Sequence, residues 1–245
     1  MRPQFASLIL LLVSLTACSN SIYGWTVRTN STQPRGEFHP TVLEREPVAI
    51  FEAVALSSLR GSELGLAPYL AEILGKVAPS IKVISPLETA NRINTRGLTT
   101  DYVRMRADLE QSNILEAGAL RKIGTGIGAR YVFQPRLASF TQTMIDRWKF
   151  TDLRIVQTRS SLLRCSLQLW DTNTGEQIWA SVAEAVLSNE AVSQDPVYLE
   201  DAARVALGSI IADFLRGKTA STYTPLNKFL DDLIQRPEPE KKPEP

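Results

Sequence analysis

An alternation of apolar and polar residues from Leu163 to Trp170 places the firmest constraint on how this chain folds. The apolar positions are Leu163, Cys165, Leu167 and Leu169. Because successive side chains of a β-strand point to opposite faces, this pattern predicts a strand with one buried face. Asp171 to Gly175 has the composition of a tight turn, and Glu176 to Val186 is predicted to be a returning strand. The sequence therefore predicts an antiparallel hairpin, with Cys165 as a small core residue rather than a reactive thiol.

The order of the other hydrophobic segments predicts one mixed α/β domain. Short apolar runs predict strands at residues 48–56, 81–84 and 130–137, and apolar residues at helical spacing predict helices at 66–77, 86–93, 99–110, 114–123 and 199–214. This order, with a hairpin and a long helix at its end, indicates an α/β (α+β) fold with a mixed β-sheet and flanking helices. We expect the domain to occupy residues 47–217 of the 245 residues.

Gly124, Gly126 and Gly128 lie between a predicted helix and a predicted strand. A phosphate-binding loop needs the opposite order, in which a strand leads into a helix whose N-terminal amides face the anion. We therefore interpret these glycines as the turn that ends the helix, and we expect no nucleotide site there.

Composition excludes several classes of function. The formal net charge is +1, whereas nucleic-acid binding needs an excess of Lys and Arg on one face, so we expect no nucleic-acid partner. His39 is the single histidine, which excludes most zinc sites and any Ser/His or Cys/His catalytic arrangement that does not include it. No nucleotide, thiol-redox or zinc-protease motif is present. We predict no catalytic residue, no metal site and no cofactor, although a carboxylate pair that forms on folding stays open.

The N-terminal residues have the pattern of an export signal. Arg2 gives a positive start, and an apolar run extends from Phe5 to Leu15. This run is shorter than the roughly 20 residues of a membrane-spanning helix and suits the core of a signal peptide. Ordinary cleavage after Ala17 would place Leu15 where a small side chain is wanted. The sequence Leu15-Thr16-Ala17-Cys18 instead resembles the lipobox of bacterial lipoproteins.

The lipobox resemblance implies a lipid anchor. Residues 1–17 would be a lipoprotein signal peptide, and Cys18 would receive a diacylglycerol group and become the new N-terminus. Ser19 in the next position implies sorting to the outer membrane, on its periplasmic face. Two or more acyl chains hold a protein firmly, at about 0.8 kcal/mol for each buried CH₂. With the Cys18 sulfur in a thioether, Cys165 has no partner for an intramolecular disulfide.

Two polar segments flank the predicted domain. Residues 18–46 have no sustained period and are predicted to be a tether, whose aromatic residues Tyr23, Trp25 and Phe38 are expected to pack on the domain. Residues 218–245 contain a short amphipathic helix and a disordered Pro/Glu/Lys tail. The apolar face of this helix comprises Leu226, Phe229, Leu230 and Leu233. We expect this face either to dock a partner by helix-in-groove packing or to fold back on its own domain.

Three stretches together resemble a superfamily of periplasmic lipoprotein domains. They are Gly128 to Phe133, Leu167 to Trp179 with its Asp-Thr-Asn-Thr-Gly-Glu turn, and the closing helix from Val197. The superfamily includes the curli secretion channel subunit, the penicillin-binding-protein activator lipoproteins and the N-terminal domain of the Tol-system translocation protein. The resemblance covers residues 48–215 and implies a protein that is not an enzyme and that binds envelope proteins or copies of itself.

The chain departs from this superfamily in two respects. Pro135 stands where members usually have Gly, and since proline cannot donate to a central ladder, we expect an edge strand or a bulge there. Residues 144–157 carry charged side chains on both faces, which argues against the membrane-inserted hairpins of the curli channel subunit.

We therefore expect a non-catalytic, outer-membrane-anchored lipoprotein. It would contact the membrane through its N-terminal lipid, bind one or more envelope proteins, and act as an adaptor or assembly factor in cell-envelope biogenesis or secretion. Three alternatives stay open: a homo-oligomeric component similar to a secretion channel, an auxiliary lipoprotein of a transporter, and an envelope hydrolase whose carboxylates gather on folding.

Overall fold

A computed structural model describes residues 22–55, 57–61, 63, 65–150, 153–191 and 198–224. Its centre is an eight-stranded mixed sheet with the order β4-β2-β5-β6-β7-β1-β8, in which β3 also pairs with β5. The strands are β1 (Ile22–Ser31), β2 (Val48–Ile50), β3 (Val54–Ala55), β4 (Val83–Ile84), β5 (Tyr131–Phe150), β6 (Leu153–Asp171), β7 (Glu176–Ala191) and β8 (Ala220–Tyr223). β2 and β3 form parallel pairs, and all other pairs are antiparallel. The predicted mixed α/β fold is confirmed.

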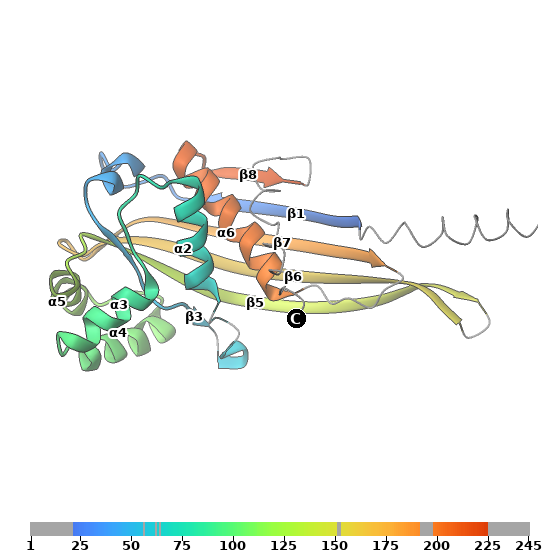
Figure 1. Cartoon of the computed structure of the whole chain (residues 1–245), viewed down its shortest axis with the longest axis horizontal. Coiled ribbons are helices and arrows are strands. Elements are labelled where there is room, and N and C mark those ends of the chain that lie inside the picture. Colours follow the sequence, from blue (N-terminus) through green and yellow to red (C-terminus); the bar gives the residue numbers. More distant parts are fainter. Residues whose placement is uncertain are drawn as a thin grey trace, which may run out of the picture.

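Helices cover both faces of this sheet (Figure 1). They are α2 (Leu66–Val77), α3 (Pro86–Thr95), α4 (Thr99–Ser112), α5 (Ala117–Ile127) and α6 (Leu199–Arg216), with 3₁₀ turns η1 (Pro40–Glu44) and η2 (Ser57–Leu59). α2 and α6 form one hydrophobic core with one face of the sheet, and α3, α4 and α5 form a second core on the other face. Among the described residues, no helix has both the length and the hydropathy that a bilayer span requires.

The predicted hairpin is present as β6 and β7. Its four apolar positions are fully buried, and the register pairs Asp171 with Glu176. One Asp171 carboxylate oxygen accepts hydrogen bonds from the backbone N–H groups of Asn173 (2.8 Å) and Thr174 (3.3 Å), which fixes the turn. Cys165 is fully buried, so the prediction of a core cysteine is confirmed, and this burial raises the pKa of its thiol to about 12.

The predicted closing helix, α6, is more deeply buried than its sequence pattern indicates. Nearly every residue from Asp201 to Phe214 is buried, because α2 packs over a helix that already lies on β6, β7 and β1. Small side chains allow this close packing. They are Ala202, Ala203, Ala206, Gly208 and Ala212. The helix ends at Gly217, whose φ of +64° is the left-handed cap that the sequence predicts.

The predicted tether is wrong for residues 22–46. β1 lies within the sheet between β7 and β8, and Leu43 of η1 is fully buried. The alternation of β1 is hidden in the sequence because two positions on its buried face are hydroxyl residues. Thr29 donates to the carboxylate of Asp213, and Ser31 pairs with Ser181 (2.8 Å). The described fold therefore runs from β1 to β8, beyond the expected boundaries at both ends.

Two of the aromatic residues in this segment pack on the domain, as predicted. Trp25 is buried on the α6 side of the sheet, and Phe38 packs against the same core. The side chain of Tyr23 lies outside the described residues.

The glycine-rich segment differs from its prediction in detail. α5 continues through Gly124 and Gly126 to Ile127, and Gly128 (φ +71°) is the left-handed cap. A side chain at Gly124 would overlap Thr172, and one at Gly126 would overlap Leu98. The first two glycines thus permit close packing of α5 rather than a turn, and their space is already filled by protein.

Pro135 lies inside the sheet, so the expected edge position is wrong. The Tyr131 N–H donates to the Pro47 carbonyl (3.2 Å) on the β2 side of β5. Backbone nitrogens of a strand point to alternate sides, so the nitrogen of Pro135, four residues after Tyr131, faces the same side. There β2 has ended and β3 pairs only from Arg136 onward, so no ladder hydrogen bond is lost. The predicted strand 48–56 is split into β2 and β3 at this break, and a register irregularity follows in β5 between Leu137 and Ser139.

Candidate functional site

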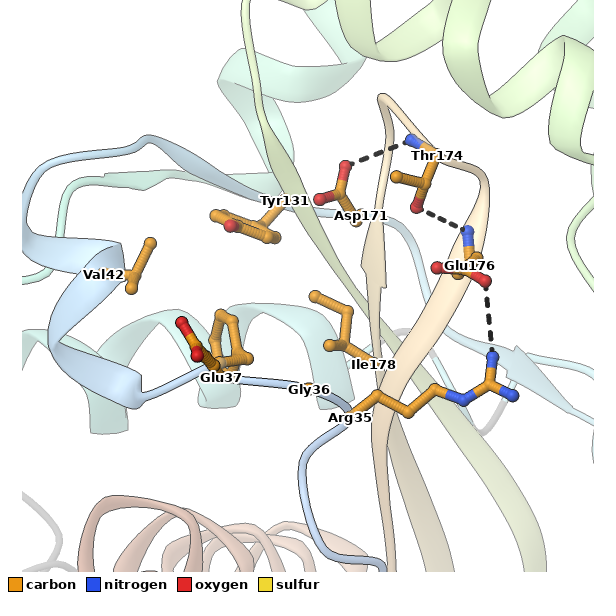
Figure 2. A pocket seen from close by; sticks show the side chains of 10 residues that line it. Arg35, Gly36, Glu37, Val42, Tyr131, Asp171, Thr174, Glu176 and Ile178 are labelled. Atoms are coloured by element: carbon orange, nitrogen blue, oxygen red, sulfur yellow. Dashed lines mark hydrogen bonds and ion pairs between the residues drawn. The ribbon is translucent and has the colours of Figure 1, made fainter.

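A hollow of about 530 Å³ lies between the segment before η1 and the turn that joins β6 to β7 (Figure 2). Its walls come from three regions that are distant in the sequence: residues 35–42, the first residue of β5, and residues 171–178. The volume is within the range of about 300–1,000 Å³ that is typical of ligand sites in proteins. We take this hollow as the candidate functional site.

The local sequence explains how residues 35–42 form one wall. After β1, the Thr32 N–H donates to Ala180 (2.8 Å) and the Arg35 N–H donates to Ile178 (2.9 Å), so the chain still follows β7. Gly36 has a φ of +62°, a left-handed conformation that lets the chain turn away from β7. η1 then starts at Pro40, with His39 as its N-cap. The single histidine thus has a structural role as a capping residue.

The floor of the hollow is apolar. Phe38, Val42 and Ile178 are partly buried side chains that pack on the core beneath α6. The ring of Phe38 meets the edge of the Tyr131 ring with centroids 5.4 Å apart. Such edge-to-face contacts stabilise aromatic pairs by about 0.5–1.5 kcal/mol beyond their buried area. The floor is therefore held in place by the core and can receive an apolar group.

Charged residues form the rim, and most of them are paired. Arg35 lies 3.5 Å from Glu176 across the hollow, as the dashed line in Figure 2 shows. Asp171 is held by the guanidinium of Arg130 (3.1 Å) as well as by the turn amides. Glu37 differs from these, since no ion pair or hydrogen bond to its carboxylate is found among the described residues. Figure 2 shows its carboxylate turned toward the side of the hollow where Tyr131 and Val42 lie.

Tyr131 supplies a hydroxyl group to the lining of the hollow. The residue is 5% exposed, and the structure gives its hydroxyl no hydrogen-bond partner among the described residues. Burial raises the pKa of the Tyr131 hydroxyl, while the Arg130 guanidinium, 5.4 Å from the ring centroid, opposes this rise. The hydroxyl therefore stays protonated at neutral pH and is available both to donate and to accept a hydrogen bond.

A second hollow, of about 640 Å³, lies over β1 and β7 on the face opposite α6. Val182 is 51% exposed there, and Arg28 pairs in register with Glu184, which is bound to Arg164 (2.6 Å). This surface is the open face of an antiparallel sheet. The buried polar residues that line it are hydrogen-bonded: Thr29 to Asp213, and Ser31 to Ser181.

The structure does not test the sequence-predicted site residues. Cys18 and the apolar face Leu226, Phe229, Leu230 and Leu233 are outside the described residues. No group of three or more His, Cys, Asp or Glu side chains able to hold a metal is found in the part of the chain that the structure describes. Folding does gather carboxylates around the first hollow, namely Glu37, Asp171 and Glu176. Two of these three are engaged with arginines, so the set does not form an acid/base pair.

The residues of the first hollow were missed in the sequence because the segment that supplies one wall was interpreted as a tether. The sequence signal for this wall is Phe38, an aromatic residue that is expected to pack on the domain and does so. Nothing near Glu37 or Tyr131 in the sequence indicates that the two would meet.

The sequence matches no protein-family model and no curated protein. Solved structures resemble the fold. One is the PelC dodecamer from Paraburkholderia phytofirmans, with a TM-score of 0.42, 12% identity, and coverage of 77% of this chain and 97% of that chain. Another is lipoprotein GNA1162 from Neisseria meningitidis, with a TM-score of 0.37, 11% identity, and coverage of 70% and 96%. A third is the C-terminal domain of LpoB from Escherichia coli, with a TM-score of 0.32, 15% identity, and coverage of 57% and 81%.

Proposed function

We propose that this chain is a non-catalytic lipoprotein, anchored by Cys18 to the periplasmic face of the outer membrane, that binds an envelope protein as an adaptor or assembly factor. The observation that carries the proposal is the Leu-Thr-Ala-Cys sequence at residues 15–18. It stands directly ahead of a fold whose first described strand begins at Ile22. Three residues separate the acylated position from this strand, so the two ends of the connection lie at most about 15 Å apart.

The direction of β1 supports a role for the first hollow in binding a partner. β1 has ten residues and rises about 3.3 Å per residue, so its end at Ser31 lies about 30 Å from its start. Arg35 and Glu37 follow that far end, and Figure 1 shows α3, α4 and α5 at the same end of the sheet. An anchor at the start of β1 thus leaves the hollow at the end of the fold away from the lipid. A protein in the periplasm can reach it there.

Mass spectrometry of the chain purified from bacterial membranes tests the anchor. We expect a mature chain that begins at Cys18, with a diacylglycerol group on its sulfur and without residues 1–17. An unmodified Cys18 thiol, or a cytosolic chain that keeps its leader, would show that the proposal is wrong.

Site-specific crosslinking in cells tests the adaptor role. A photo-reactive residue at Arg35, on the rim of the hollow, is expected to crosslink the same envelope protein in repeated experiments. The control position is Asp108, an exposed residue of α4, which packs on the opposite face of the sheet. Equal crosslinking from both positions, or none from Arg35, counts against a partner at the hollow.

The predicted C-terminal helix needs a separate test. A chain that ends at Thr224 lacks Leu226, Phe229, Leu230 and Leu233. If these residues dock a partner, the shortened chain keeps its melting temperature and loses the partner that co-purifies with the full chain. A lower melting temperature instead indicates that the helix folds back on its own domain.

A further inference from the structure

We propose that the hollow beside the β6–β7 turn receives a basic side chain, arginine or lysine, of the protein partner. This inference rests on the proposed adaptor function and names the chemistry that the partner presents. It starts from two groups in the hollow that the described residues leave without a partner, the Glu37 carboxylate and the Tyr131 hydroxyl.

The charge around the hollow favours a cation. Three carboxylates line it, from Glu37, Asp171 and Glu176, against one lining cation, Arg35. Arg35 is paired with Glu176, and Asp171 is paired with Arg130 behind the wall. Glu37 is left as the lining charge with no counter-ion among the described residues. A positive group that enters the hollow therefore meets a net negative environment, and an anion would be repelled.

The Tyr131 hydroxyl favours a hydrogen-bond donor. Tyr131 lines the hollow as a residue that is 5% exposed, and its hydroxyl has no hydrogen-bond partner among the described residues, so a donor that enters the hollow can bind it. Tyr131 stays protonated at neutral pH, so its oxygen is free to accept a hydrogen bond from a guanidinium or an ammonium group. Glu37 lines the same hollow, so a cation that enters it is also attracted by the Glu37 carboxylate (Figure 2).

The apolar floor favours a cation on an aliphatic stem rather than a bare ion. Phe38, Val42 and Ile178 offer hydrocarbon surface next to the two polar groups. Arginine and lysine place a charged head on three or four methylene groups, and their stems pack on apolar surface while the head stays hydrated or paired. A metal ion fits less well, since no cluster of three ligand side chains is found among the described residues.

A titration with short peptides tests the proposal on the full chain. Methyl groups of Ile178 and Val42 line the hollow, so their NMR signals in a chain labelled at Ile and Val methyls report occupancy directly. The probes are Ac-Gly-Arg-Gly-NH₂ and Ac-Gly-Lys-Gly-NH₂, and the matched control is Ac-Gly-citrulline-Gly-NH₂. Citrulline keeps the shape of arginine without its charge. We expect saturable shifts of both methyl signals with the basic peptides and none with the citrulline peptide.

Two variants assign the binding to the two groups. Glu37→Gln removes the negative charge, and Tyr131→Phe removes an oxygen that accepts from the charged donor. Each variant is expected to weaken binding of the arginine peptide about tenfold. Tyr131→Phe is expected to keep the melting temperature, because its hydroxyl has no described partner to lose. The control is Asp108→Asn on α4, which changes the net charge as Glu37→Gln does and is expected to bind like the unchanged chain.

Several results would overturn the proposal. Equal binding of the citrulline peptide shows that charge is not recognised, and unchanged binding by Glu37→Gln places the cation elsewhere. Shifts of the Ile178 and Val42 methyls when residues 225–245 are removed, without any peptide, assign the hollow to the lysines of the chain's own tail. Shifts that follow the protein concentration assign it to a second copy. An unacylated Cys18 would refute the anchor and leave these peptide results in place, so the two failures are distinguishable.

Discussion

Asp213 links the two strands at one edge of the sheet to α6. Its side chain is fully buried, and it accepts hydrogen bonds from the hydroxyls of Thr29 on β1 and of Ser221 (2.7 Å) and Tyr223 (2.6 Å) on β8. The three hydroxyl donors satisfy a side chain that would otherwise be buried without partners. This explains why polar residues occupy the buried face of β1.

Tyr223 gives this cluster a measurable pH dependence. Burial, and then the hydrogen bond to Asp213, raise the pKa of Tyr223 to about 12. An unfolded tyrosine loses its proton near pH 10. The folded chain therefore keeps the proton over a range in which the unfolded chain has lost it, and the free energy of unfolding falls between about pH 10 and 12.

The variant Tyr223→Phe lacks this titration. At neutral pH we expect it to be less stable than the unchanged chain by about 1–2 kcal/mol, the cost of a lost hydrogen bond to a carboxylate. The difference is expected to shrink as the pH approaches 12, and denaturant unfolding at a series of pH values measures it. Cys165 is present in both proteins, so its own titration cancels. A difference that stays constant with pH would contradict the assigned pKa.

Two helical glycines, one packed and one exposed, allow a comparison of Gly→Ala substitutions at single residues. Gly124 of α5 lies against Thr172, whose hydroxyl donates to the Ala129 carbonyl (2.8 Å) in a fully packed contact. Gly75 of α2 is exposed, with open space around the position of an added Cβ. We expect Gly124→Ala to destabilise the chain by about 1–3 kcal/mol through overpacking. Gly75→Ala is expected to stabilise it by up to about 1 kcal/mol, because alanine has the higher helix propensity.

Thermal or denaturant unfolding of both variants measures these changes. A neutral Gly124→Ala would show that α5 and the turn after β6 can move apart at little cost. That result would weaken the argument that the side chain of Thr172 fills the space beside Gly124.

At the scale of elements, local patterns predict those parts of the fold that depend on neighbouring residues in the sequence. α2 has its predicted bounds, with Pro68 in its first turn, and the turn from Asp171 to Gly175 forms as its Asp and Gly residues indicate. α6 ends at the predicted Gly217. Each of these features is decided within a few residues, by a cap, a turn or an apolar stripe.

Features that depend on distant contacts were not predictable. β1 has Thr29 and Ser31 on its buried face, and only Asp213 and Ser181, more than 100 residues away, make those positions favourable. The candidate site was not predictable for the same reason. Glu37, Tyr131 and Ile178 come from three distant regions, and only the register of β5 with β6 and β7 brings them to one end of the sheet.

Adjacent residues of β1 test its place in the sheet. Val27 is fully buried beneath α6, and Arg28 is exposed on the opposite face. Val27→Asn is expected to lower the free energy of unfolding by about 3 kcal/mol, because it buries an amide without partners. Arg28→Asn is expected to change it by less than about 0.5 kcal/mol. Denaturant unfolding distinguishes the two, and equally small effects would mean that residues 22–31 form a tether after all.

At the scale of the whole molecule, the start of β1 and the candidate site lie at opposite ends of the sheet. Burial of Thr29 and Ser31 makes β1 an integral strand, and only three residues separate the proposed acylation site from it. If Cys18 carries the proposed lipid, the length of β1 and these three residues set an upper limit on the distance between the bilayer and the hollow.

The two cysteines separate anchoring from folding. Cys18→Ser removes the proposed acylation site, so we expect the chain to leave the membrane fraction while keeping its melting temperature, because the described fold begins at Ile22. Cys165→Ala is expected to do the opposite: the chain stays in the membrane fraction but loses about 1 kcal/mol of stability, since a small cavity opens in the core beneath α6. Membrane fractionation with a high-salt wash, combined with thermal unfolding, measures both changes. If Cys18→Ser still sediments with the membrane after the wash, the surface of the folded domain and not a lipid on Cys18 provides the attachment.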